Sequence, residues 1–195
     1  AVAGDEAGDE DGDAGRKAPP PRWRTLLDWV VVIAVALLVA FVVRTYVLAH
    51  FVVDGRSMES TLHNGDRVFV NKIGYRFHDP RRGDVVVLHD SKSDRDRDLI
   101  KRVIALPGET ISMIDCEVRI DGVVLDEPYL DEEHRLPGGC GAGVPEQVIP
   151  DGAVFVLGDN RDDSADSRSL GVVEHDEIVG RAFVIFWPVT DLRWL

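Results

Sequence analysis

Three polar segments, each beside an apolar run, carry the side chains of this sequence that are best suited to chemistry. The first is Asp54–Leu62 (DGRSMESTL), in which Ser57 closely follows the apolar run Phe51–Val53. A serine at the point where a strand ends can present its hydroxyl as a nucleophile while backbone amides face a ligand. The same pattern also describes a turn serine without a function. Glu59 excludes the nucleophile elbow of α/β-hydrolases, which needs glycine at that position.

The second segment, Asp98–Glu109 (DLIKRVIALPGE), places two basic residues within a predicted strand. Because side chains alternate between the two faces of a strand, Lys101 and Arg102 should point in opposite directions, one inward and one outward. One of them is therefore predicted to be a buried cation. The alternatives are that the inward cation forms a structural ion pair, or that the two residues guard an edge strand against aggregation.

The third segment, Gly158–Arg168 (GDNRDDSADSR), follows the apolar run Ala153–Leu157 and is dense in carboxylate, amide and hydroxyl groups. This composition predicts either a loop locked by its own hydrogen bonds or a calcium-like site. The spacing does not match an EF-hand, which also requires a terminal Glu. The pattern alone does not decide between the two.

Few bases are available to activate a serine. Lys101 is the lysine flanked by apolar residues, Lys72 is the runner-up, and the remaining lysines are Lys17 and Lys92. An apolar environment lowers the pKa of a lysine, so a desolvated Lys101 could act as a neutral base. A Ser-His-Asp triad is the competing arrangement, with His63 or His89 as its base. No residue spacing typical of a metal site is present, and no metal or other cofactor is expected.

An apolar stretch near the N-terminus is predicted to anchor the chain in a membrane. Leu26–Val43 holds eighteen residues with Asp28 as the only charge, and a helix of that length covers about 27 Å. The stretch is flanked by aromatic residues, as in the aromatic belt of a membrane span: Trp23, Trp29 and Tyr46. We therefore predict a transmembrane helix over residues 26–45. The alternatives are a buried core helix and a cleavable signal peptide ending at Val47–Ala49.

The charges around this helix predict its orientation. Residues 1–15 contain six acidic and no basic side chains, so we expect residues 1–25 to form a disordered acidic cytoplasmic tail with a basic flank. Four basic residues precede the helix, and only Arg44 follows it closely. The positive-inside rule then puts the N-terminus in the cytoplasm, and everything after about residue 45 outside the plasma membrane.

Beyond the helix, the sequence predicts a mainly β, antiparallel fold. Short runs of β-formers are separated by Gly, Pro and Asp, and Asp121-Gly122 indicates a hairpin. We assign residues 46–112 and 150–195 to a catalytic β-domain. Residues 113–149, which become acidic and Gly/Pro-rich, are assigned to an inserted hairpin and loop subdomain. The predicted strands are Phe51–Val53, Arg67–Lys72, Asp84–His89, Leu99–Ala105, Val118–Leu125, Ala153–Leu157 and Ile178–Trp187.

Charge and cysteine content exclude several classes of protein. The chain has 35 acidic against 22 basic residues, a net charge of −13 and no dense basic patch, so no nucleic-acid partner is expected. Two cysteines are too few for a zinc module or a Cys-x-x-Cys redox pair. Cys116 and Cys140 fall on the predicted outside, where oxidation is permitted, so we predict a disulfide rather than two unpaired thiols.

In this order, and after a single N-terminal anchor, the three segments resemble the bacterial type I signal peptidases, or leader peptidases. Ser57–Leu62 is similar to the S-M-x-P-T-L box of that family, Lys101–Gly108 to its K-R-V-I-x-x-P-G box, and Gly158–Arg168 to its G-D-N-R-x-x-S-x-D-S-R box. The resemblance covers residues 26–188. Ser60 replaces the proline of the first box, which we expect to loosen the turn after Ser57.

The resemblance implies a membrane-anchored serine endopeptidase with the signal peptidase or repressor-autoprotease-like fold. It would remove signal peptides from exported preproteins after small residues (A-x-A-like), without a cofactor, at the lipid bilayer beside the export machinery. Ser57 would be the nucleophile, Lys101 the general base, and Ser164 the hydroxyl that orients the lysine amine. Gly55 stands where some members carry an oxyanion-donating serine, so the Ser57 backbone N–H would serve instead. The other residues implied to support the site are Met58, Arg102, Asp159, Asp166 and Arg168.

Two other classes of function stay open on the sequence. A serine-lysine autoprotease of the repressor type has the same dyad, but it would need a DNA-binding or polymerase-linked domain in place of the anchor. A non-catalytic, membrane-anchored β-domain acting as an adaptor would carry the same segments without using them. Cleavage of a second protein distinguishes the peptidase from both.

The predicted orientation is tested by protease protection. Protease added outside intact spheroplasts should digest the β-domain and spare the acidic tail, because the tail lies behind the membrane. An epitope at each end of the chain reports the outcome on an immunoblot. Loss of the tail with retention of the β-domain would invert the topology.

Overall fold

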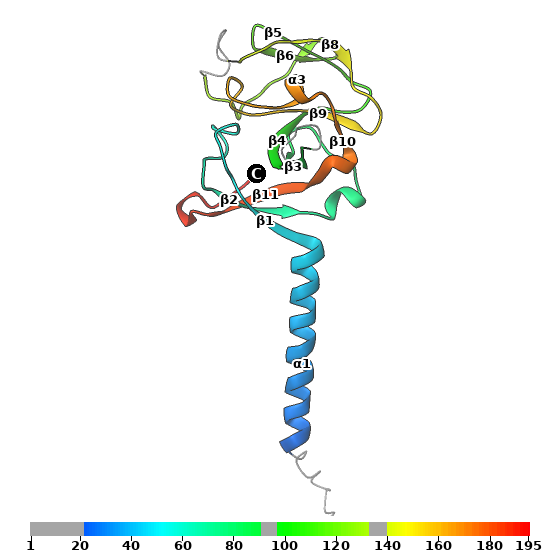
Figure 1. Cartoon of the computed structure of the whole chain (residues 1–195), viewed down its shortest axis with the longest axis vertical. Helices are drawn as coiled ribbons and strands as arrows, with labels where there is room; N and C mark the ends of the chain where they lie inside the picture. Colours follow the sequence, from blue (N-terminus) through cyan, green and yellow to red (C-terminus); the bar gives the residue numbers. More distant parts are fainter. Residues whose placement is uncertain (1–21, 91–96, 133–139) are drawn as a thin grey trace, which may run out of the picture. The chain divides into compact units, whose positions relative to one another are not determined.

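The computed structural model describes residues 22–90, 97–132 and 140–195 (Figure 1). The chain divides into two compact units, Ala1–Phe41 and Val42–Leu195, which are described separately. The predicted acidic tail lies outside the described residues, as do two of the lysines considered above, Lys17 and Lys92.

The N-terminal unit contains the helix α1 (Arg22–Val42), which a π-helical turn η1 (Val43–Val47) continues into the second unit. The segment Leu26–Thr45 is long and apolar enough to cross a membrane. Its side chains are exposed throughout the described part, so no protein core covers them. This excludes the buried core helix, and the predicted N-terminal apolar helix is confirmed.

The larger unit is built around an antiparallel sheet in the order β1-β2-β11-β3-β4-β9-β10, with β12 pairing to β11. This confirms the predicted mainly β, antiparallel class. The predicted strands correspond to β1, β2, β3, β4, β6 with β7, β9 and β11. The bounds in the main sheet are β1 Leu48–Val52, β2 Arg67–Asn71, β3 Val85–His89, β4 Asp98–Ala105, β9 Ala153–Leu157, β10 Val173–Glu174, β11 Ile178–Trp187 and β12 Arg193–Trp194.

The central strands of this sheet are apolar on both faces. In β3, Val85 and Val87 pack in one core cluster, whereas Val86 and Leu88 pack in another. Strands covered on both sides read as continuous apolar runs rather than as alternating ones. Burial on both faces also corrects the prediction for β4. We expected either Lys101 or Arg102 to face outward, but both are buried. The alternation is real, but each face of β4 meets protein.

A second sheet, in the order β7-β6-β5-β8, packs its own core against the first and is visible at the top of Figure 1. It consists of β5 Thr110–Ile114, β6 Glu117–Ile120, β7 Val123–Val124 and β8 Val144–Val148. Asp121 and Gly122 both have positive φ in the predicted hairpin turn. We did not predict β5 and β8, and the proposed subdomain boundary at residue 113 falls inside β5. The short helices are η2 Gly74–Arg76, α3 Ser167–Leu170, η3 His175–Glu177 and η4 Val189–Asp191.

A disulfide joins the two cysteines, with their Cα atoms 5.3 Å apart. Cys116 lies in the turn between β5 and β6, and Cys140 lies shortly before β8. Both residues are buried. The bridge therefore links a hairpin turn of the second sheet to the loop that enters β8.

Thiol labelling tests this disulfide in the purified chain. Maleimide labelling of unreduced, denatured protein should modify essentially no thiol, and labelling after reduction should modify both, as mass spectrometry will show. Two labelled thiols without reduction would mean that the cysteines are unpaired.

Candidate active site

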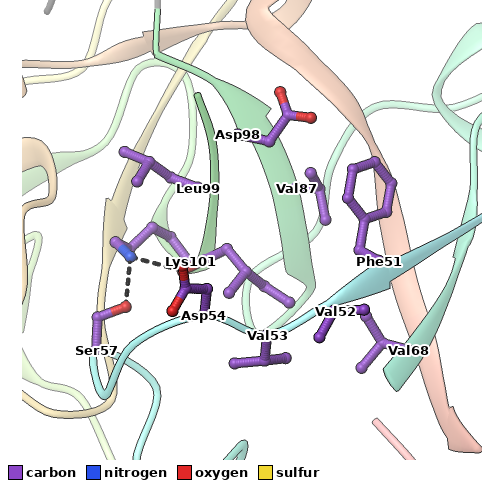
Figure 2. A pocket seen from close by; sticks show the side chains of 11 residues that line it. Phe51, Val52, Val53, Asp54, Ser57, Val68, Val87, Asp98, Leu99 and Lys101 are labelled. Carbon is purple, nitrogen blue, oxygen red and sulfur yellow. Dashed lines mark hydrogen bonds between the residues drawn. The ribbon is translucent and has the colours of Figure 1, made fainter. Parts of the chain in front are cut away.

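Ser57 lies in the tight turn that follows β1. Its Oγ accepts a hydrogen bond of 2.7 Å from Nζ of Lys101, which reaches it from β4 (Figure 2). The turn is closed by hydrogen bonds from the backbone N–H groups of Thr61 and Leu62 to the carbonyl of Met58. Met58 and Leu62 are fully buried beneath it. The apolar residues of the first box thus fix the backbone that carries the hydroxyl.

Ser60, which replaces the proline of the first box, adopts a left-handed backbone conformation with φ +94. Proline is held near φ −65, so proline cannot occupy this turn as it stands. The Ser60 hydroxyl donates a 2.8 Å hydrogen bond to the carboxylate of Asp131. The expected loosening is therefore opposed by a side-chain contact that proline could not make.

Lys101 is a buried amine, with 2 % of the residue exposed. Besides Ser57, its Nζ donates to the carbonyl of Ile100 at 2.7 Å. Burial lowers the pKa of Lys101 to about 8, because desolvation disfavours the charged form. The carboxylates of Asp166 and Asp159 oppose this shift, while the nearby Arg97 adds to it. The pKa of Lys101 is thus close to the value that a base needs near neutral pH.

A cavity of about 90 Å³ opens beside the two side chains (Figure 2). It lies between residues from the end of β1 and the first half of β4. Carboxylates of Asp54 and Asp98 also belong to its lining. The apolar lining residues are Phe51, Val52, Val53, Val68, Val87, Leu99 and Ile100. The cavity thus offers a small space, lined by apolar side chains and two carboxylates, next to a hydroxyl and an amine.

Arg102 faces away from this cavity and forms a buried pair with Asp159. Its Nε and Nη2 donate to the two carboxylate oxygens of Asp159 at 2.9 and 2.7 Å. Burial opposes the charge of Arg102, but the Asp159 hydrogen bonds and charge hold the pKa of the guanidinium above its usual value. Nη2 also donates to the Thr61 hydroxyl at 3.0 Å, so the pair joins β4, the serine turn and the loop after β9.

Asp166 forms a second two-pronged ion pair, with Arg168 at the end of the same segment. Arg168 donates from Nε and Nη2 to its two oxygens at 2.8 Å each, and the Gly158 N–H donates to it at 3.0 Å. Burial would raise the pKa of Asp166, but the Arg168 guanidinium holds that pKa below its ordinary value. Both charged carboxylates are thus engaged by arginines. Within the described residues no three metal-ligating side chains gather, and the geometry favours the hydrogen-bonded loop over the calcium-like site.

Gly158 brings this loop into contact with the serine turn. A Cβ at this position would lie 2.3 Å from Ser164 Oγ and 2.4 Å from the carbonyl oxygen of Ser57. The same carbonyl accepts a 3.1 Å hydrogen bond from the Asn160 N–H. Ser164 is therefore beside Ser57, and its buried Oγ lies near the Asp166 carboxylate, where it helps to lower the pKa of that group without a hydrogen bond of regular geometry in the described part of the chain. Its predicted bond to the Lys101 amine is not formed in this conformation.

Sequence reasoning missed a buried ion pair behind this loop. Arg161, which is fully buried, donates from Nε to the Gly158 carbonyl at 3.0 Å and pairs through its guanidinium with Glu127. Glu127 also accepts a hydrogen bond from Tyr129, whose ring lies 4.0 Å from the guanidinium carbon of Arg102. Glu127 was assigned to the insertion on its acidic, Pro-rich surroundings. Apart from the nearby Tyr129, the sequence around Glu127 does not indicate that this residue is buried.

No hydrogen bond joins any of the competing bases among the described residues to Ser57. His63 and His89 are exposed, as is Lys72. His89 lies 3.2 Å from Asp98 and His63 lies 4.0 Å from Asp66. Gly55, with φ +105, donates its N–H to Asn64. Across the described ranges, no histidine belongs to the cavity lining, and the side chain that contacts Ser57 Oγ is a lysine.

Comparisons with known proteins show the family of this chain. The family described as signal peptidase, peptidase S26, matches residues 26–187. Signal peptidase IB of Staphylococcus aureus (strain MRSA252) is 36% identical over 183 residues, which cover 88% of this chain and 94% of that protein. Signal peptidase I T of Bacillus subtilis (strain 168) is 35% identical over 182 residues, 91% of this chain and 93% of that protein. A crystal structure of a signal peptidase I from Enterococcus faecalis is 32% identical with a TM-score of 0.45, covering 52% of this chain and 95% of that one. The chain belongs to the signal peptidase family, peptidase S26, and is a type I signal peptidase that acts on the signal peptides of preproteins.

Proposed function

We propose that this signal peptidase cuts its substrates by a serine-lysine mechanism, with Ser57 as nucleophile and Lys101 as general base. The observation that carries the proposal is the 2.7 Å contact between a buried lysine amine and the Ser57 hydroxyl. A lysine is a useful base only when an appreciable fraction of it is neutral. The depressed pKa of Lys101, about 8, meets that requirement.

The steps follow from this contact. Neutral Lys101 takes the proton of the Ser57 hydroxyl as Oγ attacks the scissile carbonyl carbon, forming a tetrahedral intermediate. The backbone N–H of Ser57 donates to the oxyanion, since Gly55 brings no side-chain donor. The Lys101 ammonium then returns the proton to the leaving amine. Water, activated by the same neutral amine, hydrolyses the acyl-enzyme and releases Ser57.

The loop after β9 is proposed to hold the Ser57 and Lys101 side chains in their correct relative positions. Asp159 and Asp166 are tied by two-pronged ion pairs to Arg102 and Arg168, which keep the loop backbone beside Ser57. Ser164 is close to the dyad, because its buried hydroxyl and the Ser57 carbonyl both lie against Gly158. We propose that it accepts a hydrogen bond from the Lys101 amine when substrate displaces part of the present network.

The cavity supports cleavage after small residues in an A-x-A-like pattern. Its volume of about 90 Å³ is well below the roughly 150 Å³ of an apolar cavity that holds benzene. An extended substrate lying between β1 and β4 would direct alternate side chains into it. Small apolar side chains therefore fit, and aromatic ones do not.

The apolar helix supports membrane anchoring with the catalytic domain on the outer side. A preprotein is held in the same bilayer by its own apolar signal segment, so anchoring raises the local concentration of the scissile bond. We propose the N-terminus to be cytoplasmic, the plasma membrane to be the location, and the export machinery to be a neighbour. The net charge of −13 supports the absence of a nucleic-acid partner.

Substitution of the dyad tests the mechanism. Ser57→Ala and Lys101→Ala should each lower kcat for a preprotein supplied in trans by about a thousandfold or more, and the double variant should be no worse. Lys101→Arg should fail equally, because a guanidinium cannot accept the proton.

Lys72→Arg, His63→Ala and His89→Ala are the matched controls, and each should keep most of the activity. An active Lys101→Arg enzyme together with an inactive histidine variant would show that a triad serves the serine. Retained trans cleavage in Ser57→Ala would remove the serine mechanism altogether.

The pH profile tests the protonation state of the base. With a Lys101 pKa of about 8 in the folded enzyme, the active neutral fraction falls as pH drops below 8. The value of kcat/KM should therefore be about tenfold lower at pH 7 than at its alkaline plateau. A profile that is flat from pH 6 to 9 would contradict a lysine base with this pKa.

Gly158→Ala tests the contact between the loop and the serine turn. The added methyl would overlap Ser164 Oγ and the Ser57 carbonyl, so kcat should fall at least about tenfold while the fold persists by circular dichroism. Gly74→Ala is the control, since its Cβ meets only movable side-chain atoms at 3.2 Å or more. Full activity in Gly158→Ala would show that this approach is unimportant.

A further inference from the structure

The disulfide reaches the active site through a short chain of contacts. The carbonyl of Cys140 accepts a 2.5 Å hydrogen bond from Nη1 of Arg168. The other two nitrogens of that guanidinium hold Asp166, and Asp166 accepts from the N–H of Gly158. Gly158 in turn lies against the carbonyl of Ser57. Three hydrogen-bonded links and one close packing contact thus connect a covalent cross-link to the residue that carries the nucleophile.

The residue after Cys140 reinforces this contact. A Cβ on Gly141 would lie 3.1 Å from Arg168 Nη1 and 3.1 Å from the backbone oxygen of Arg161. The Cys140–Gly141 backbone therefore packs directly on the two arginine positions that flank the loop. The Arg168 side chain is only 7% exposed, so water has little access to replace the Cys140 carbonyl if it moves.

The other end of the bridge is held firmly. Cys116 occupies the turn between β5 and β6, where Asp115 and Cys116 both have positive φ. Asp adopts this conformation readily in hairpin turns, whereas Cys adopts it rarely. The hairpin turn thus fixes the sulfur of Cys116, and the disulfide fixes Cys140 against Arg168.

We infer that Cys140, held by its disulfide to Cys116, is a positioning residue of the active site, which keeps the Arg168 guanidinium on Asp166. This inference rests on the proposed serine-lysine mechanism. It gives the bridge a role in rate, beyond any contribution to stability. Since the disulfide needs an oxidising compartment, the site would reach its full rate only outside the cytoplasm.

The expected consequence concerns the protonation of Lys101. Asp166 raises the pKa of that amine, and Arg168 neutralises part of the Asp166 charge. When Arg168 loses the Cys140 carbonyl it is held less tightly, so the Asp166 charge acts more strongly on Lys101 and the amine stays protonated to higher pH. The other charged groups near the amine are Asp159 in the same loop, Arg97 before β4, and Asp54 and Asp98 at the cavity. None of these contacts Cys140.

The test compares the full-length enzyme in detergent before and after reduction with a phosphine, which supplies two electrons and leaves two thiols to be blocked with N-ethylmaleimide. A fluorogenic peptide with an Ala-x-Ala site reports kcat/KM from pH 6 to 10. In the pH profile of kcat/KM, the acid limb of the reduced enzyme should move to higher pH by about half a unit, so that the rate at pH 7 falls about threefold. The rate at each pH is expressed per folded enzyme, as measured by circular dichroism, so that partial unfolding does not imitate the shift.

Two variants assign the shift to the proposed route. The double variant Cys116→Ser/Cys140→Ser should show the acid limb of the reduced enzyme and should not respond to the phosphine. In the Arg168→Gln variant, the acid limb of the pH profile should already be displaced in the oxidised enzyme. Reduction of this variant should displace the limb little further, because the disulfide acts through Arg168. Additive effects of reduction and Arg168→Gln would overturn the inference.

The inference and the proposed mechanism fail in different ways. If the oxidised enzyme shows no Ser57-dependent cleavage, the serine-lysine mechanism itself is wrong. If cleavage depends on Ser57 but the reduced enzyme keeps the oxidised pH profile, only the role of the disulfide is wrong. A uniform loss of rate at every pH would likewise reduce the bridge to a purely structural element.

Discussion

A lysine amine held out of water beside a serine hydroxyl is the constraint on which most of this structure depends. The amine of Lys101 must be desolvated to lose its proton near neutral pH, so β4 has to be covered where that residue lies. The serine turn provides part of that cover, with Met58 and Leu62 buried beneath it. One requirement of chemistry therefore shapes both the central strand and the turn after β1.

The same burial creates an electrostatic difficulty, which the loop after β9 resolves. Two carboxylates, Asp159 and Asp166, lie close enough to raise the pKa of Lys101 and so work against a neutral amine. Each accepts a two-pronged set of hydrogen bonds from its own arginine, Arg102 or Arg168. Pairing reduces the field that each carboxylate exerts on the lysine while retaining the loop geometry. The arginines thus favour the neutral form of Lys101 without touching it.

Much of this arrangement was predictable because its signals are local. Ser57 closely follows one apolar run and Lys101 lies within another, and the Asp121-Gly122 turn has its own sequence pattern. The β5–β8 pairing and the Glu127–Arg161 ion pair were not predictable, since each joins residues more than 30 positions apart. Strand alternation gives the face of a side chain but not what covers that face. For this reason the burial of both Lys101 and Arg102 emerged only from the packed sheets.

Keeping the amine neutral also has a cost to folding. The folded-state pKa of Lys101, about 8, lies below its unfolded value of 10.5. The unfolded chain therefore binds more protons between these two pH values, and stability rises with pH across that window. Below pH 8 the penalty is complete, at about 3 kcal/mol, a large fraction of the net stability of a domain. The paired cores of the two sheets and the Cys116–Cys140 bridge offset a penalty that the site itself imposes. Reactive geometry at Lys101 is thus maintained by parts of the protein that never meet the substrate.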